Sequence, residues 1–168
     1  MNCLKVLKKS VIDSQLYVSL MGTVFAVFFM MEQNTFRSPS VLLIFITYFS
    51  GYLYTKYQKT KYFYNILILN FVTGIISAAL IIFNHNEIRL VKWFVIVVSG
   101  LLYNSFFLET YIRKIPLLKV FYVGLVWALV NCWLTLPAFN FPIFFISFFF
   151  VTALVLPFDI RDMKSDTV

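Results

Sequence analysis

Residues 62–83 read YFYNILILNFVTGIISAALIIF, an apolar stretch without one charged side chain. A helix of about 20 apolar residues is long enough to cross the hydrocarbon core of a lipid bilayer. The stretch is followed by Asn84, His85, Asn86 and Glu87, which are polar residues typical of a loop. It therefore predicts a transmembrane helix, and the rest of the chain can be examined for others like it.

The composition of the whole chain also favours a membrane protein. Of its 168 residues, 61% are hydrophobic and only 12% are charged. Soluble chains are typically about a quarter charged, so this chain has too few charges to cover a surface that faces water. Its length has room for about six spans with short connections. We expect a single all-α integral membrane domain covering residues 1–168.

Six apolar runs divide the chain into these expected spans. They lie at about 16–31, 41–54, 62–83, 90–108, 116–136 and 141–158, after a basic interfacial segment at 1–14 and before an acidic cytoplasmic segment at 159–168.

The basic residues predict how the spans are oriented, because short loops rich in Lys and Arg stay in the cytoplasm. One side of the expected bundle receives Lys5, Lys8, Lys9, Lys56, Lys59, Lys61, Arg113, Lys114, Lys119, Arg161 and Lys164, and the other receives Arg37, Arg89 and Lys92. Both termini are therefore expected on the cytoplasmic side of the cytoplasmic (inner) membrane. The chain has a net charge of +7, but its basic residues lie beside the apolar runs and form no long cationic face. We therefore expect membrane lipids and no nucleic acid as partners.

The acidic segment carries three of the four aspartates of the chain: Asp159, Asp162 and Asp166. On a helix, offsets of three and seven residues place them within an arc of roughly 60°. Such a stripe of carboxylates at a membrane surface can hold Mg²⁺, which prefers oxygen ligands and is often shared with substrate phosphates. The alternative is a solvated tail that ends a membrane helix.

Two short segments resemble a known family. Pro157-Phe158-Asp159-Ile160-Arg161-Asp162-Met163-Lys164-Ser165-Asp166 resembles the second aspartate-rich motif of UbiA-type intramembrane prenyltransferases, which follows their sixth span. Tyr103-Asn104, then Ile115-Pro116-Leu117-Leu118-Lys119, resembles the tyrosine-to-lysine segment between the fourth and fifth spans of that family.

This resemblance implies the first two-thirds of a nine-helix fold in which Mg²⁺ ions bind an isoprenyl diphosphate in a cavity facing the cytoplasm. By position, Asp159, Asp162 and Asp166 would be metal ligands, and Lys119 and Tyr103 would lie near the diphosphate. The implied reaction transfers the isoprenyl group from its diphosphate to an aromatic or lipid acceptor in the membrane. The 21 Phe and 10 Tyr residues of the chain could supply aromatic faces for the isoprenoid tail and for an allylic cation. The alternative is that they are lipid-facing and interfacial residues, which are commonly aromatic in membrane proteins.

The sequence departs from the family in two places. Residues 50–61, where the family has its first aspartate-rich motif, contain no Asp or Glu. Either Lys56 and its neighbouring lysines meet the diphosphate directly, or Tyr52, Tyr54 and Thr55 form a divergent site, or the chain is not catalytic. The family also continues for about three spans beyond the acidic motif, so we expect a further C-terminal part, a complementing subunit or a truncated remnant. The rival class is a non-enzymatic six-helix membrane protein, such as a small transporter or an assembly subunit.

Polar and small residues inside the spans have a simpler expected role. Asn70, Thr73, Ser77 and Asn131 are expected to form hydrogen bonds between helices more often than to line a cavity. Gly22, Gly51, Gly74, Gly100 and Gly124 are expected at close helix contacts. Cys3 and Cys132 indicate neither a disulfide framework nor a zinc site.

Overall fold

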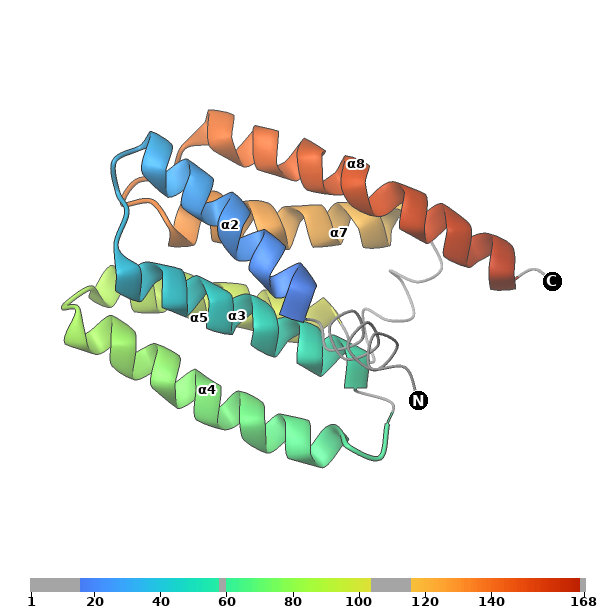
Figure 1. Ribbon diagram of the computed structural model, residues 1–168, viewed down its shortest axis with the longest axis horizontal. Coiled ribbons are helices and arrows are strands. Elements are labelled where there is room, and N and C mark those ends of the chain that lie inside the picture. Colours follow the sequence, from blue (N-terminus) through green and yellow to red (C-terminus); the bar gives the residue numbers. More distant parts are fainter. Residues whose placement is uncertain (1–15, 58–59, 104–115, 167–168) are drawn as a thin grey trace, which may run out of the picture. The chain divides into compact units, whose positions relative to one another are not determined.

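The computed structural model describes residues 16–57, 60–103 and 116–166, and for residues 116–117 and 158–166 it describes the backbone alone. This part of the chain consists of helices and short connections, without a strand (Figure 1). The helices are α2 (Leu16–Glu32), α3 (Ser38–Tyr57), α4 (Phe63–Phe83), α5 (Glu87–Tyr103), α7 (Pro116–Ala128), the π-helical segment η1 (Leu129–Leu134) and α8 (Phe141–Asp166). The expected all-α fold is thus confirmed for the described residues.

Each apolar run of the sequence contains a helix, but the bounds differ from the expected ones. α3 is longer at both ends than the expected 41–54, and α5 begins at Glu87, before the expected 90. The last residues of the expected fourth span, 104–108, lie outside the described part. α8 passes through Pro157 and continues to Asp166, so the acidic segment extends the last helix.

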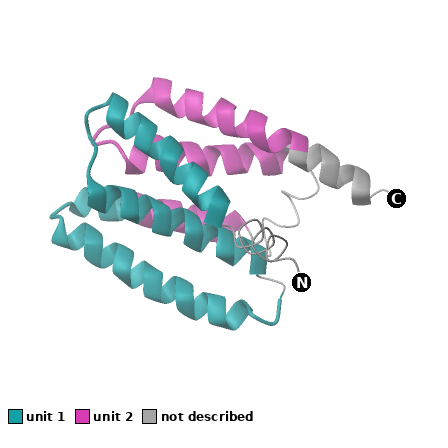
Figure 2. Ribbon diagram, in the orientation of Figure 1, with its two compact units in different colours: residues 1–91 teal, residues 92–168 magenta. Residues whose placement is uncertain are grey.

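Residues 1–91 form one compact unit and residues 92–168 another (Figure 2). In unit 1, α3 packs against both α2 and α4. The buried side chains at these contacts include Ala26 and Met30 on α2, Leu43 and Ile44 on α3, and Ile81 on α4. Phe29 and Tyr48 are buried as well, so the core of unit 1 is mixed aliphatic and aromatic, and α3 is its central helix.

Helices α2 and α4 end in the same way. Asn34 (φ 52°) and His85 (φ 50°) adopt the left-handed conformation that usually favours glycine. The next backbone N–H in each case, from Thr35 or Asn86, donates to a carbonyl five residues earlier, at 2.8 and 3.4 Å. This pattern is the Schellman cap, which satisfies the last carbonyls of a helix. It reverses the chain in a few residues, so α3 and α5 begin where α2 and α4 finish.

Unit 2 contains a hairpin in which α7 and η1 pack against α8. Hydrogen bonds hold both ends of the connection between η1 and α8. Asn140 Oδ1 accepts the backbone N–H of Ile143 at 3.1 Å, which caps the start of α8. The Lys92 ammonium donates to the carbonyls of Leu136 and Pro137 at 3.2 and 3.1 Å, just beyond the end of η1. A cation beside the C-terminal carbonyls of a helix is favourable.

Within the described residues, one helix is long and apolar enough to cross a membrane by length and composition: α4, with a mean hydropathy of 2.6. Shorter apolar helices lie at Leu16–Glu32, Leu118–Leu134 and Phe141–Pro157. Only 11% of the apolar window of α4 is buried, and large side chains such as Phe71 and Phe83 are exposed. The outer face of α4 is therefore apolar along its length.

Candidate functional site

The three aspartates expected to bind Mg²⁺ lie on the last turns of α8. Because the helix continues to Asp166, positions 159, 162 and 166 keep the helical spacing that places them within about 60° of one another. Their side chains lie outside the described residues, so metal binding by Asp159, Asp162 and Asp166 stays a prediction. Among the side chains that are described, no group of three or more His, Cys, Asp or Glu residues forms a metal site.

Helices α7 and α8 approach each other closely at Gly124. A Cβ atom built there would lie 3.2 Å from the carbonyl oxygen of Phe148 and would overlap Thr152 Oγ1. Nearby, the rings of Phe121 and Phe148 stack with their centroids 6.0 Å apart. Glycine at this position therefore sets the spacing of the hairpin, as small residues do where helices pack closely in membranes.

This contact fixes which ends of the hairpin lie together. Lys119 precedes Gly124 by five residues, and Pro157 follows Thr152 by five, so antiparallel packing sets Lys119 opposite Pro157. Asp159 is two residues further along α8, about 3 Å along the helix axis. The backbone positions of Lys119 and of the first expected metal ligand thus share one end of the hairpin. Lys119 itself is partly exposed.

Tyr103 meets α7 one turn from Lys119. Its ring stacks on that of Tyr122, with the centroids 5.5 Å apart and the planes 26° apart. The Tyr122 hydroxyl donates to the Ser99 carbonyl at 2.5 Å, which ties α7 to the last turn of α5. Because Lys119 and Tyr122 are three residues apart on a helix, they are neighbours on its surface. Tyr103 and Lys119, expected beside the diphosphate, are therefore close in unit 2.

Lys56, the third residue expected to bind diphosphate, lies in the last turn of α3 and belongs to unit 1. Its ammonium lies 5.9 Å from the centroid of the Tyr57 ring. The Lys61 ammonium lies 5.2 Å from the centroid of the Tyr62 ring. Lysines beside tyrosines at helix ends suit the headgroup layer of a membrane, where the ammonium reaches the polar zone. Lys59 lies outside the described residues.

Of the polar residues inside the helices, Thr73 and Asn131 join helices as expected, whereas Ser77 Oγ and the Asn70 carboxamide oxygen are buried without a hydrogen-bond partner among the described residues. The hydroxyls of Ser50 on α3 and Thr73 on α4 lie 2.8 Å apart. Asn131 Nδ2 donates to Ser147 Oγ at 3.0 Å, and both residues are fully buried between η1 and α8. Asn131 lies in the π-helical segment, which turns more widely than an α-helix and aims this side chain at α8. The side chains of Ser50, Thr73, Asn131 and Ser147 form hydrogen bonds between helices, so we do not include them in the candidate site.

A second polar group, which the sequence analysis did not single out, lies at the start of α3 and α5 in unit 1. The Arg89 guanidinium donates to Ser40 Oγ at 2.7 Å. The sequence contains one sign of this group: Arg37 and Arg89 are two of only three basic residues expected on the side of the membrane opposite the cytoplasm.

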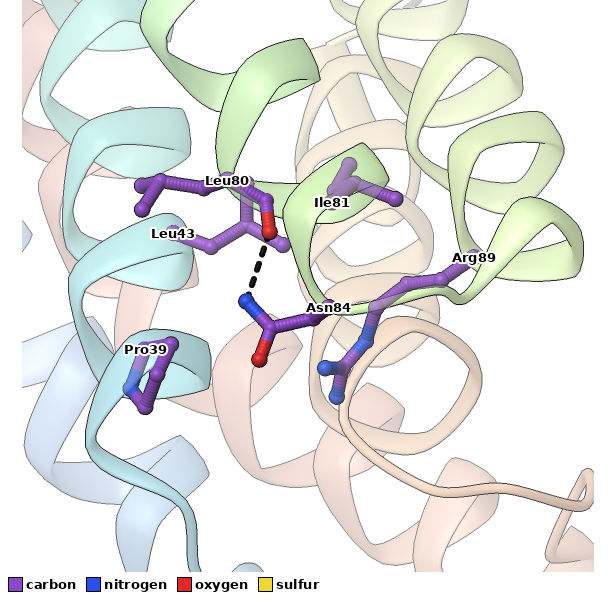
Figure 3. A pocket seen from close by; sticks show the side chains of 6 residues that line it. All are labelled: Pro39, Leu43, Leu80, Ile81, Asn84 and Arg89. Atoms are coloured by element: carbon purple, nitrogen blue, oxygen red, sulfur yellow. Dashed lines mark hydrogen bonds between the residues drawn. The ribbon is translucent and has the colours of Figure 1, made fainter.

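Arg89 also lines a small hollow with Pro39, Leu43, Leu80, Ile81 and Asn84 (Figure 3). Its empty volume is about 190 Å³, including the opening to solvent. The Asn84 amide donates to the Leu80 carbonyl at 2.6 Å, and its carboxamide lies beside the Arg89 side chain. The hollow therefore has an apolar wall and a polar rim.

Comparisons of the chain with protein-family models, with curated proteins and with solved structures gave no match.

Proposed function

We propose that this chain is a multi-pass protein of the cytoplasmic membrane, with its six helical regions as spans and both termini in the cytoplasm. The exposed apolar surface of α4 supports this placement. Soluble monomers rarely expose contiguous apolar patches beyond a few hundred Å², whereas lipid accepts such a surface without cost. The short helices α2 and α5, of 17 residues each, are compatible with spans because the bilayer thins locally around a short helix and flanking side chains extend to the interface.

Within the membrane, the proposed activity is that of a UbiA-type prenyltransferase: Mg²⁺-dependent transfer of an isoprenyl group from its diphosphate to an aromatic or lipid acceptor. The observation that carries this proposal is the register of the α7–α8 hairpin. It brings Lys119 to the end of α8 that bears Asp159, Asp162 and Asp166, and Tyr103 adjoins the same part of α7. Acidic residues for a metal and a cation for phosphate are the two components that a metal–diphosphate complex requires.

Different residues of unit 2 would bind the metal, the diphosphate and the isoprenyl tail. Mg²⁺ held by the aspartates would neutralise the diphosphate and make it a better leaving group. Lys119 would bind a phosphate oxygen as a point charge, and the Tyr103 hydroxyl would donate to another. The stacked rings of Phe121, Phe144 and Phe148 would give the isoprenyl tail an apolar, electron-rich surface.

The rival proposal is a non-enzymatic six-helix membrane protein whose acidic residues only end a helix. It is favoured by the stretch 50–61, which carries basic residues and no acid where the family has its first aspartate motif. Under this proposal Lys56 and its neighbours would contact lipid headgroups. The two proposals differ in one measurable property, which is Mg²⁺-dependent affinity for an isoprenyl diphosphate.

The experiment compares farnesyl diphosphate binding by the wild type, Asp162→Asn and Asp13→Asn in detergent, with and without Mg²⁺. Asp162→Asn keeps the shape of the side chain but removes a strong oxygen ligand, so affinity should fall about tenfold or more, in line with the loss of a metal ligand or its support. Asp13→Asn makes the same chemical change outside the acidic segment and should bind like the wild type. Equal affinity in all three proteins, or binding without Mg²⁺ dependence, would favour the non-enzymatic alternative.

A further inference from the structure

Tyr122 on α7 contacts the last turn of α5 at two points. Its ring stacks on that of Tyr103, with the centroids 5.5 Å apart, and its hydroxyl donates to the Ser99 carbonyl at 2.5 Å. Ser99 and Tyr103 are four residues apart, so they lie on one face of α5, and in an α-helix the carbonyl of residue 99 accepts the N–H of residue 103. A carbonyl oxygen has two lone pairs and can accept from both donors. Tyr122 therefore supports one turn of α5 through its backbone and through the Tyr103 side chain.

Tyr103 lies where such support matters. It is the last residue of α5, and helix ends lose their order more readily than helix interiors because fewer backbone hydrogen bonds hold them. A hydroxyl on a loosely held side chain is a weak donor to a ligand, since binding must first fix its rotamer. Stacking of the ring and a hydrogen bond to the same helical turn reduce this entropic cost before a ligand binds.

The position of Tyr122 on α7 also links Tyr103 to the α7–α8 hairpin. Gly124, two residues further along α7, packs against α8. Lys119, three residues before Tyr122, is its neighbour on the surface of α7. The hairpin thus fixes α7 and Lys119, and the contacts of Tyr122 extend this placement to Tyr103 on α5.

We propose that Tyr122 is a positioning residue of the candidate diphosphate site, which holds the Tyr103 hydroxyl beside Lys119 for a phosphate oxygen. This inference rests on the proposed prenyltransferase function. Tyr122 itself needs no contact with the substrate, because its hydroxyl is bound to the Ser99 carbonyl and its ring to Tyr103. Its effect on diphosphate binding should therefore pass through Tyr103 and disappear when the Tyr103 hydroxyl is removed.

The test measures Mg²⁺-dependent binding of farnesyl diphosphate to the full chain in detergent. Tyr122→Phe keeps the stacked ring and loses the hydrogen bond to Ser99, so affinity should fall about threefold. Tyr122→Leu loses both contacts, and affinity should fall about tenfold. The control Tyr64→Leu makes the same chemical change at an exposed position of α4 and should bind like the wild type.

A second background separates positioning from a general loosening of the fold. Tyr103→Phe keeps the ring that stacks on Tyr122 but removes the hydroxyl that would donate to the phosphate. In this background Tyr122→Leu should cause no further loss of affinity, because residues that act through one another are not additive. The same fold loss from Tyr122→Leu in both backgrounds, or an equal loss in Tyr64→Leu, would overturn the positioning role.

A readout without ligand separates this proposal from the function on which it rests. With 3-fluorotyrosine at position 103, the ¹⁹F resonance should shift in Tyr122→Leu, which removes the neighbouring ring, and stay in place in Tyr64→Leu. An unshifted resonance in Tyr122→Leu, beside intact Mg²⁺-dependent binding by the wild type, would overturn the positioning role alone. A shifted resonance in a chain whose wild type binds no farnesyl diphosphate with Mg²⁺ would refute the proposed function.

Discussion

Substituting Gly124 by alanine should weaken the α7–α8 hairpin, because α8 leaves no room for a Cβ atom at this position. The added methyl group would overlap Thr152 Oγ1 and lie 3.2 Å from the Phe148 carbonyl oxygen. The neighbouring atom on Phe148 is backbone, so it can move only if α8 moves. Overpacking of this kind typically costs about 1–3 kcal/mol.

The gain in helix propensity acts in the other direction. Replacing glycine by alanine in a helix interior stabilises by about 1 kcal/mol. The net effect at Gly124 is therefore a loss of about 0–2 kcal/mol. Gly100, also in unit 2, has no atom within 4 Å of its hypothetical Cβ among the described residues, so Gly100→Ala retains the gain without the overlap. The difference between the two variants, about 1–3 kcal/mol, measures the contact alone.

The free energy of unfolding can be measured by titrating each variant with SDS in mixed micelles and following the tryptophan fluorescence, since Trp127 and Trp133 lie in α7 and η1. Gly124→Ala should unfold at lower SDS than Gly100→Ala, and Thr152→Ala in the Gly124→Ala background should recover part of the loss. Equal stability of the two glycine variants, or no recovery in the double variant, would refute the close contact and with it the register that places Lys119 near Asp159.

Three further results are expected. Lys92→Met should lower the free energy of unfolding by about 1–2 kcal/mol in the same titration, because the Leu136 and Pro137 carbonyls lose a charged donor; an unchanged stability would contradict this capping role. His85→Gly should stabilise the protein by up to about 1 kcal/mol and His85→Val should destabilise it, because only glycine adopts positive φ without strain; the reverse order in thermal unfolding would argue against this C-cap. Reporter fusions after Val168 and within the connection at Asn86 should give opposite sides of the membrane, and a C-terminus outside the cytoplasm would refute the proposed topology.

The sequence predicted where helices form because the apolar runs are long and their interruptions are polar. Asn86 and Asn140 are recognisable N-caps, and each precedes the helix that it caps. The sixth span was expected to end at about 158, and α8 continues through Pro157 to Asp166, which gives the three aspartates the helical spacing expected for the acidic stripe. Proline lacks only one backbone donor, and in a helix with sufficient contacts this loss does not end the helix.

Packing details were less predictable, because they depend on partners that local sequence does not identify. Close helix contact was expected at several glycines and occurs at Gly124, but the expectation is wrong for Gly51, Gly74 and Gly100, which have open space around them among the described residues. The π-helical turn at Asn131 accompanies a hydrogen bond to Ser147, sixteen residues away, which local sequence does not identify. The sequence suggested which residues belong to the candidate site, but not which of them lie close together. The register of the α7–α8 hairpin shows that Lys119 lies near the acidic end of α8.

Metal-directed cleavage would test the proposed diphosphate site most directly. Fe²⁺ can replace Mg²⁺ at oxygen ligands and, with ascorbate and peroxide, generates radicals that cut the backbone close to the metal; mass spectrometry then locates the cuts. With farnesyl diphosphate present, the account predicts cuts within 158–166 and around Lys119, suppressed by excess Mg²⁺ and absent in Asp162→Asn. Cuts confined to other segments, or cuts at 158–166 that persist unchanged in Asp162→Asn, would contradict a metal–diphosphate site at this end of the hairpin.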